Sequence, residues 1–162
     1  MCLFHIVNSK GILFVKYSLL TVEIYDNIME LGGIVLNTIS NMLQARTWAV
    51  IGASDNKQKF GYKIFKCLVD NGLEVYAVNP GVSELLGQKC YASIKDLPTK
   101  PEAVDIVVPP RHGEQIIREC AEAGIRNIWL QPGADSEELI KIGQQLGLNV
   151  VHHACIMVEL NK

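Results

Sequence analysis

The residues best suited to chemistry in this chain are Gly52-Ala53-Ser54, which directly follow the apolar run Trp48–Ile51. Their small side chains let a ligand approach the backbone closely, and the amides at the start of the following helix would point toward the same space. Free N–H groups and the helix dipole together favour a phosphate group. The Ser54 hydroxyl would add a donor, and Lys57 or Lys59 a positive charge. The alternative is an ordinary strand-to-helix turn in which Gly52 only relieves backbone strain.

The end of the second strand indicates which phosphate-bearing ligand the turn would suit. A site for NAD usually places Asp or Glu there, where the carboxylate holds the adenosine ribose hydroxyls. Here the strand ends in neutral Asn79-Pro80-Gly81, and Ser54 and Lys57 stand at the second and third glycine positions of the dinucleotide pattern. NAD is therefore disfavoured. A ribose that carries a 3′-phosphate would be repelled by a carboxylate and would accept Asn79 and nearby lysines.

Two further strand ends, Val108-Pro109-Pro110 and Gln131-Pro132-Gly133, would lie at the same edge of a parallel sheet, where ligands bind. Arg111 is either a phosphate partner or a solvated residue at a helix start.

His152-His153-x-Cys155 resembles a metal cluster, but we interpret the histidines as the end of the last strand and predict no metal site. We interpret Cys155 as a small buried hydrophobic residue, with a reactive thiol as the alternative.

These turns need alternating strands and helices, and the sequence after residue 46 predicts them. The predicted strands are Thr47–Gly52, Glu74–Asn79, Val104–Val108, Asn127–Gln131 and Asn149–His152, with a short one at Lys89–Tyr91. The predicted helices are Gly61–Asn71, Gly113–Ala123 and a helix that Ser136 caps and that ends near Gly147. Ser83–Leu86 and Ser93–Leu97 are predicted as short helical turns.

The pattern predicts an α/β fold. Strands that are apolar on both faces and separated by helices are typical of a buried parallel sheet. Right-handed crossovers then produce an open, doubly wound, mostly parallel, Rossmann-like sheet of about five strands, with helices on both faces. In such a sheet the ligand lies outside the carboxyl ends of the strands, where the strand order reverses.

Composition excludes several classes of protein. Hydrophobic residues make up 49% and charged residues 20% of the 162 residues, which is an ordinary globular balance. The net charge of −2, without a run of lysine or arginine, argues against a nucleic-acid surface. The five cysteines are odd in number and form no C-x-x-C pair, so we expect reduced thiols in a cytoplasmic protein rather than a disulfide framework or a zinc site.

Residues 1–45 differ from the rest of the chain. Lys16 separates the apolar runs Ile12–Val15 and Leu19–Val22, so no run reaches the ~18 apolar residues that a membrane-spanning helix needs. Neither a signal peptide nor a membrane segment is predicted. We interpret residues 1–45 as an extension that is loosely packed or not native, with Met29 and Met42 as internal start candidates. Residues 46–162 are the predicted domain.

From about Trp48 to Glu159 the chain resembles the CoA-binding domain family, small Rossmann-like proteins akin to the N-terminal domain of the succinyl-CoA synthetase α subunit. The order and spacing of the matching segments agree throughout, although each segment alone is weakly specific. These segments are Val50–Ser54, Lys59–Tyr62, Val78–Pro80, Asp105–Pro110, Trp129–Ala134 and Cys155–Glu159. Residues 1–45 lie outside the resemblance.

The resemblance also implies a set of CoA-binding residues. The first turn would contact the diphosphate, the second strand end would border the adenosine portion, and the two prolines of the third strand end would line the other side of the cleft. In chain order, the implied residues are Gly52, Ala53, Ser54, Lys57, Lys59, Gly61, Tyr62, Asn79, Pro80, Val108, Pro109, Pro110 and Arg111. Lys57, Lys59 and Arg111 are the expected phosphate partners, and Tyr62 would pack at the entrance.

The leading functional hypothesis is a stand-alone protein that binds CoA or an acyl-CoA and has no catalytic residue of its own, so an enzyme is the less favoured reading. One alternative is a CoA-handling subunit of an acyl-CoA ligase or transferase complex. Another is an NAD(H)-binding regulatory module, which would need an attached DNA-binding helix-turn-helix. The expected partners are the CoA ligand and either a second copy of the chain or a ligase subunit, with no nucleic acid and no membrane.

Overall fold

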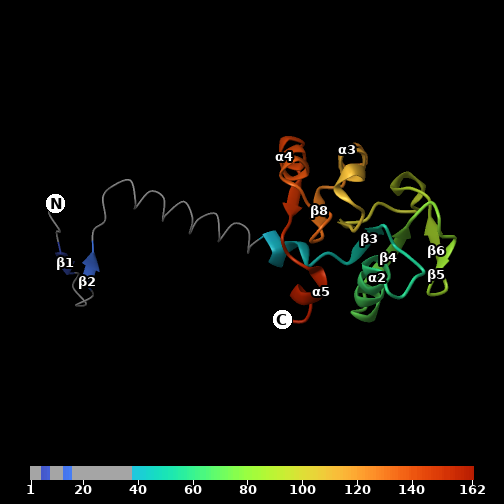
Figure 1. The fold of residues 1–162 in the computed structure, drawn as a ribbon, viewed down its shortest axis with the longest axis horizontal. Coiled ribbons are helices and arrows are strands. Elements are labelled where there is room, and N and C mark those ends of the chain that lie inside the picture. Colours follow the sequence, from blue (N-terminus) through green and yellow to red (C-terminus); the bar gives the residue numbers. More distant parts are fainter. Residues whose placement is uncertain (1–4, 8–12, 16–37) are drawn as a thin grey trace. The chain divides into compact units, whose positions relative to one another are not determined.

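The computed structural model describes residues 5–7, 13–15 and 38–162, and the chain divides into two compact units, Met1–Asn37 and Thr38–Lys162 (Figure 1). In the first unit, β1 (His5–Val7) pairs antiparallel with β2 (Leu13–Val15). Leu19–Val22 and Met29 lie outside the described residues. Whether residues 1–45 belong to the native protein stays a hypothesis.

The second unit contains a seven-stranded sheet and the helices that cover it. The strands are β3 (Thr47–Ile51), β4 (Glu74–Val78), β5 (Glu84–Leu85), β6 (Gln88–Tyr91), β7 (Ala103–Ile106), β8 (Asn127–Leu130) and β9 (Asn149–Val151). The helices are α2 (Phe60–Asp70), α3 (Gly113–Glu122), α4 (Glu137–Gln145) and α5 (Ile156–Glu159), with single 3₁₀ turns η1 (Ile94–Asp96) and η2 (Pro110–His112).

The strand order confirms the predicted doubly wound fold. The strands lie in the order β5-β6-β4-β3-β7-β8-β9, and all neighbours are parallel except β5 and β6. The chain therefore builds outward from β3 through β4 to β6, then returns to β7 on the other side of β3. The order reverses between β3 and β7, which makes their carboxyl ends the expected ligand site.

Both faces of the sheet are covered, as Figure 1 shows with α3 and α4 on one side and α2 and α5 on the other. Along β3, Trp48 and Val50 belong to the core cluster that includes Phe65 of α2, whereas Ala49 and Ile51 belong to the cluster that includes Ile117 of α3. Successive strand residues point to opposite faces. The four consecutive apolar residues Trp48–Ile51 of β3 are thus explained by burial on both faces.

One predicted element is wrong. Ser83–Leu86 is not a helical turn, because Glu84 and Leu85 form strand β5 and pair with Lys89 and Gln88 of β6. The connecting residues Leu86 and Gly87 have φ values of 50° and 77°. Positive φ at both central residues is the requirement of a type I′ hairpin turn, which matches the twist of the two strands. Lys89–Tyr91 and Ser93–Leu97 are confirmed as β6 and η1.

The compact unit begins before residue 46. Residues 38–42 are helical, and Met42, 2% exposed, and Ala45 are buried in the core beside Trp48. The indole nitrogen of Trp48 donates to the Ala45 carbonyl at 3.0 Å. Across the described ranges, no helix is both long enough and apolar enough to cross a bilayer. Four cysteines are described, Cys67, Cys90, Cys120 and Cys155, and all are free thiols.

Candidate functional site

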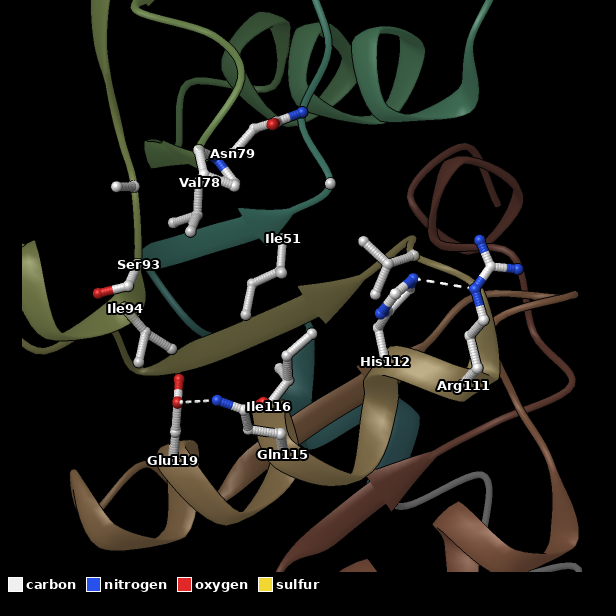
Figure 2. A pocket seen from close by; sticks show the side chains of 14 residues that line it. Ile51, Val78, Asn79, Ser93, Ile94, Arg111, His112, Gln115, Ile116 and Glu119 are labelled. Carbon is white, nitrogen blue, oxygen red and sulfur yellow. Dashed lines mark hydrogen bonds between the residues drawn. The ribbon is translucent and has the colours of Figure 1, made fainter.

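A pocket of about 490 Å³ opens at the carboxyl ends of β3, β4 and β7, on the α3 side of the sheet (Figure 2). We call it the switch-point pocket. Its apolar lining comes from Ile51, Val78, Ile94, Val108 and Ile116, and its polar lining includes Asn79, Ser93, Arg111, His112, Gln115 and Glu119. It lies where the strand order reverses, as the fold predicts for a ligand site.

The first turn is shaped by Gly52, which has a φ of 92°. A Cβ atom added here would lie 2.8 Å from Cγ1 of Val108, so a side chain would be both strained and in collision. The Gly52 amide donates to the Val78 carbonyl at 2.9 Å, which holds the turn against β4. Glycine at this position therefore allows the ends of three strands to meet.

Gly61 brings the start of α2 onto this turn. A Cβ atom at Gly61 would lie 2.0 Å from the carbonyl oxygen of Gly52, so only glycine permits the observed approach. Close helix–strand packing is also the role of the third glycine in dinucleotide-binding turns. Gly61 is buried, and it acts here through backbone packing rather than through exposure to the pocket.

The turn and the start of α2 carry unused amide donors. The amides of Ala53, Ser54, Phe60 and Gly61 donate no hydrogen bond to any other residue in the described part of the chain. The N-cap residue of α2, Lys59, supplies no side-chain acceptor. Ser54 Oγ accepts from the Asn56 amide at 3.2 Å, which orders the loop between them. Unpaired amides at a helix N-terminus favour an anion.

Asn79 joins the two turns that border the pocket. Its side-chain nitrogen donates to the Ala53 carbonyl at 2.6 Å, and its side-chain oxygen accepts from the Gly81 amide at 2.8 Å. The carboxamide is thus occupied by the protein backbone. Its structural effect is to hold the first turn and the end of β4 at a set separation.

The two ends of the pocket differ in charge. At one end, Nε of Arg111 donates to Nε2 of His112 at 3.0 Å, and both side chains are exposed. At the other end, Gln115 donates to Glu119 at 3.0 Å (Figure 2). The Lys95 amine lies 3.9 Å from the same carboxylate. A negatively charged ligand group is therefore favoured at the Arg111 end.

The structure separates the predicted site residues into several groups. Gly52, Asn79, Pro80, Val108 and Arg111 line the switch-point pocket. Ala53, Ser54 and Gly61 are buried in or under the first turn, and Lys57 and Lys59 are exposed before α2 without an ion pair to any described residue. Pro109 lines a second pocket. Tyr62 and Pro110 line neither pocket, and the ligand contacts of all these residues stay predictions.

Sequence reasoning missed the contribution of α3. His112, Gln115, Ile116 and Glu119 all line the switch-point pocket. Their spacing of three and four residues places them on one face of a helix, and that periodicity was the available signal. Strand ends also do not indicate Ser93, the N-cap residue of η1, or Ile94, although both line the pocket.

The second pocket, of about 340 Å³, lies on the other side of the β7 end. We call it the α2-side pocket. Its lining is Phe60, Ile64, Val107, Pro109, Gln131, Pro132, Gly133 and Cys155. Val108 lines the switch-point pocket, whereas its neighbours Val107 and Pro109 line this one. The segment that leaves β7 therefore separates the two pockets.

A buried carboxyl group lies next to a lining residue of the α2-side pocket. Gln131 donates through Nε2 to Oδ2 of Asp105 at 2.7 Å, and Oδ1 of Asp105 has no partner among the described residues. Burial raises the pKa of Asp105 to about 8, against the smaller opposing effect of the Gln131 hydrogen bond. The carboxyl group is therefore mostly protonated at neutral pH. The run Val104–Val108 is apolar except for Asp105, and its sequence does not indicate Gln131 as the partner.

The histidine pair follows β9, as predicted, and has a partner that sequence reasoning missed. Nδ1 of His153 lies 2.7 Å from Oδ2 of Asp135, and the amides of His153 and Gly133 donate to the same carboxylate. His153 has a φ of 55°, which is uncommon outside glycine. Burial lowers the pKa of His152.

The described ranges contain no group of three or more His, Cys, Asp or Glu side chains that could hold a metal ion.

Comparisons with known proteins agree with this geometry. Residues 46–161 match the family model described as the CoA binding domain. The chain is 32% identical over 119 residues to subunit alpha of ADP-forming acetate–CoA ligase II from Pyrococcus furiosus, which covers 67% of this chain but 26% of the ligase subunit. It is 32% identical over 124 residues to the uncharacterized protein YneT of Bacillus subtilis, covering 74% of this chain and 90% of YneT.

Among solved structures, a conserved hypothetical protein from Pyrococcus furiosus superposes with a TM-score of 0.68 and 43% sequence identity. The match covers 70% of this chain and 98% of that protein. The chain thus spans about a quarter of the matched ligase subunit, and nearly all of the two smaller relatives.

Proposed function

The chain belongs to the CoA-binding domain family, and from that membership we propose that it holds the diphosphate of coenzyme A on the Gly52–Ser54 turn and the adenosine portion in the switch-point pocket. The observation that carries the proposal is the contact between Gly61 and Gly52, where an added Cβ would lie 2.0 Å from a carbonyl oxygen. This contact brings the unpaired amides of the turn and of α2 together beside the pocket. A diphosphate is the group of CoA that such amides suit.

The charge distribution orients the rest of the nucleotide. The ribose 3′-phosphate is assigned to the Arg111 end of the pocket, because Arg111 is the one lysine or arginine among the lining residues, whereas the other end carries the Glu119 carboxylate. Lys57 and Lys59, which have no ion pair to a described residue, add positive charge near the diphosphate. The apolar lining from Ile51, Val78 and Ile94 offers a surface for the adenine ring.

NAD fits the same pocket less well. No carboxylate follows β4, and the Asn79 carboxamide that stands there is bonded to Ala53 and Gly81. The one carboxylate in the lining, Glu119, comes from α3 and already accepts from Gln115. The paired ribose hydroxyls of NAD therefore lack the acceptor that NAD sites usually provide.

We propose that the chain acts as a binding module and supplies no catalytic group to a reaction. The match to a ligase subunit favours a second candidate, in which the module hands CoA to a separate ligase or transferase chain. Affinity purification of the tagged chain from its host distinguishes the two. Co-elution of an ATP-grasp or ligase chain in equal amount supports the second, and recovery of the chain with CoA alone supports the first.

Calorimetric titration of the full chain with CoA, dephospho-CoA and NAD tests the assignment. We expect Arg111→Ala to weaken CoA binding roughly tenfold, the usual cost of a lost hydrogen bond to a charged group, without affecting dephospho-CoA. Arg118→Ala is the matched control, since Arg118 is exposed on α3 and pairs with Glu114 at 2.9 Å.

Two results would contradict the proposal. Binding of NAD without binding of CoA would remove coenzyme A as the ligand. If Arg111→Ala weakened the binding of CoA and dephospho-CoA equally, Arg111 would not be the residue that binds the 3′-phosphate.

A further inference from the structure

The α2-side pocket is separated from the switch-point pocket by one strand of backbone. Val108 faces the switch-point pocket, and Val107 and Pro109 face the α2-side pocket. The first turn lies against both, because Gly52 contacts Val108 and the start of α2, and Phe60 of α2 lines the α2-side pocket. A ligand anchored by its diphosphate on this turn therefore has one pocket on each side.

The lining of the α2-side pocket is apolar and uncharged. Apart from the Gln131 carboxamide and the Cys155 thiol, its side chains are hydrocarbon or glycine, and none is a lysine, arginine or histidine. Of the two lining residues from α2, Ile64 is buried, whereas Phe60 is 63% exposed. The volume of about 340 Å³ lies in the range of small-molecule sites. An apolar pocket of this size is suited to a chain of methylene groups.

Gln131 is the one fixed polar feature of the lining. It is 4% exposed, and its nitrogen is held by Asp105 at 2.7 Å. Its carboxamide oxygen accepts no hydrogen bond within the described part of the chain. Asp105 carries an unpartnered oxygen and is completely buried. A negative group brought into this pocket would lose its water and meet no lysine, arginine or histidine in the lining.

We propose that the α2-side pocket holds the acyl group of an acyl-CoA, and that it selects uncharged apolar acyl groups over acyl groups that end in a carboxylate. The inference rests on the proposed function, since the diphosphate must lie on the first turn. Coenzyme A has two arms that leave its diphosphate. With the adenosine arm in the switch-point pocket, the pantetheine arm leads toward the α2 side, and its acyl end enters the apolar pocket.

A series of ligands tests the assignment by calorimetry on the full chain. We expect affinity to rise from acetyl-CoA through butyryl-CoA to hexanoyl-CoA by up to about fourfold for each buried methylene. Butyryl-CoA and succinyl-CoA form a matched pair, because both have four-carbon acyl groups and only succinyl ends in a carboxylate. Succinyl-CoA should bind at least about tenfold more weakly than butyryl-CoA, because its carboxylate loses water without gaining a partner.

Variants of one lining residue locate the acyl group. Cys155→Phe places a ring in the pocket, so the ratio of hexanoyl-CoA to CoA affinity should fall toward one. Cys155→Ala removes the thiol without filling the pocket and should preserve the ratio. A thermal melt of each variant checks folding. If Cys155→Phe does not fold, Phe60→Ala replaces it, since Phe60 is exposed and its loss should lower the ratio several-fold.

Each other outcome overturns the inference. Equal affinities of the wild-type chain for CoA and hexanoyl-CoA would show that the acyl group lies outside the pocket. Equal loss of CoA and hexanoyl-CoA binding in Cys155→Phe would assign the pocket to the pantetheine arm. Failure to bind any of these ligands would remove the proposed function itself, and that result differs from CoA binding without acyl selectivity.

Discussion

The two pockets beside the β7 end share a backbone wall but have different chemistry. The switch-point pocket has Arg111, His112 and Glu119 in its lining, whereas the α2-side pocket has no charged side chain. The residues of the shared wall do not cause this difference, because Val107, Val108 and Pro109 are all apolar. The helical segments cause it: η2 and α3 turn polar side chains toward one pocket, and α2 turns Phe60 and Ile64 toward the other.

The comparison teaches that a single strand end can serve two kinds of ligand group. Alternation along an extended segment sends neighbouring side chains to opposite sides. Each side then takes its polarity from the helix packed there. The nucleotide and acyl ends of one ligand can thus be recognised a few residues apart.

The largest expected effect comes from Gly61→Ala, because Gly61 holds the start of α2 against the first turn, which borders both pockets. The new Cβ would lie 2.0 Å from the Gly52 carbonyl oxygen, and only a backbone shift can relieve this contact. We expect a loss of about 2–3 kcal/mol in the free energy of unfolding, measured with urea, together with loss of CoA and acyl-CoA binding.

Gly143→Ala in α4 is the control for this change. Its Cβ would lie 2.5 Å from a side-chain methyl group of Val150, on a helix that lines neither pocket. We expect a smaller loss of stability and unchanged ligand affinity. If the two variants behave alike, the Gly61–Gly52 contact does not build the site.

An intermediate effect is expected from Asp105→Asn, which acts only beside the α2-side pocket. The Asp105 carboxyl group has a pKa of about 8 in the folded chain and an ordinary value of 3.8 when unfolded. Between these values the folded state binds the extra proton, so stability is lost as pH rises, on the order of 1 kcal/mol per pH unit. Asp105→Asn should flatten this slope and make the protein more stable near pH 8.

Urea unfolding of both proteins at several pH values between about 5 and 8 measures the two slopes. Asparagine keeps an oxygen that can accept from Gln131, so the hydrogen bond is preserved. Asp70→Asn is the control, since Asp70 is exposed and pairs with Lys66 at 2.7 Å. If the free energy of unfolding changed with pH at the same rate in wild type and Asp105→Asn, burial would not raise the pKa of Asp105.

The smallest effect is expected from Lys57→Ala and Lys59→Ala, which remove charge near the turn common to both arms of the ligand. Each should weaken CoA and hexanoyl-CoA by the same few-fold factor, and added salt should reduce the loss, because exposed charges are screened. Calorimetry at low and high salt provides the measurement, with Lys66→Ala as the control. Unequal effects on the two ligands would place a lysine at the acyl side.

Much of the fold was predictable because its signals are local. The apolar runs before Gly52 and Pro80 predicted β3 and β4, and Ser136 predicted the start of α4, where its hydroxyl accepts from the Leu139 amide at 3.3 Å. The error at Ser83–Leu86 has a physical reason. A two-residue strand has too few residues for a periodic pattern, and its identity depends on pairing with β6.

The candidate site was predictable in part. Gly52, Asn79 and Arg111 could be placed at one edge because strand ends meet in a parallel sheet. His112, Gln115 and Glu119 could not be placed there from strand ends, since the pitch and packing of α3 bring them in. The α2-side pocket was not predicted as a separate site, although the sequence placed Pro109 and Gln131-Pro132-Gly133 at the ligand edge and singled out Cys155.

By itself, the sequence determined the order of strands and helices, the glycine turn after β3 and the neutral end of β4, because these depend on neighbours within a few residues. Only the tertiary structure decided what Gly61, Asn79 and Asp105 do. Gly61 packs against the Gly52 carbonyl oxygen, the Asn79 side chain donates to the Ala53 carbonyl, and Asp105 accepts a hydrogen bond from Gln131. The pairing of parallel strands brings the last two pairs together, and the packing of α2 onto the end of β3 brings the first together. The resulting contact, burial and pKa shift are therefore properties of the assembled sheet.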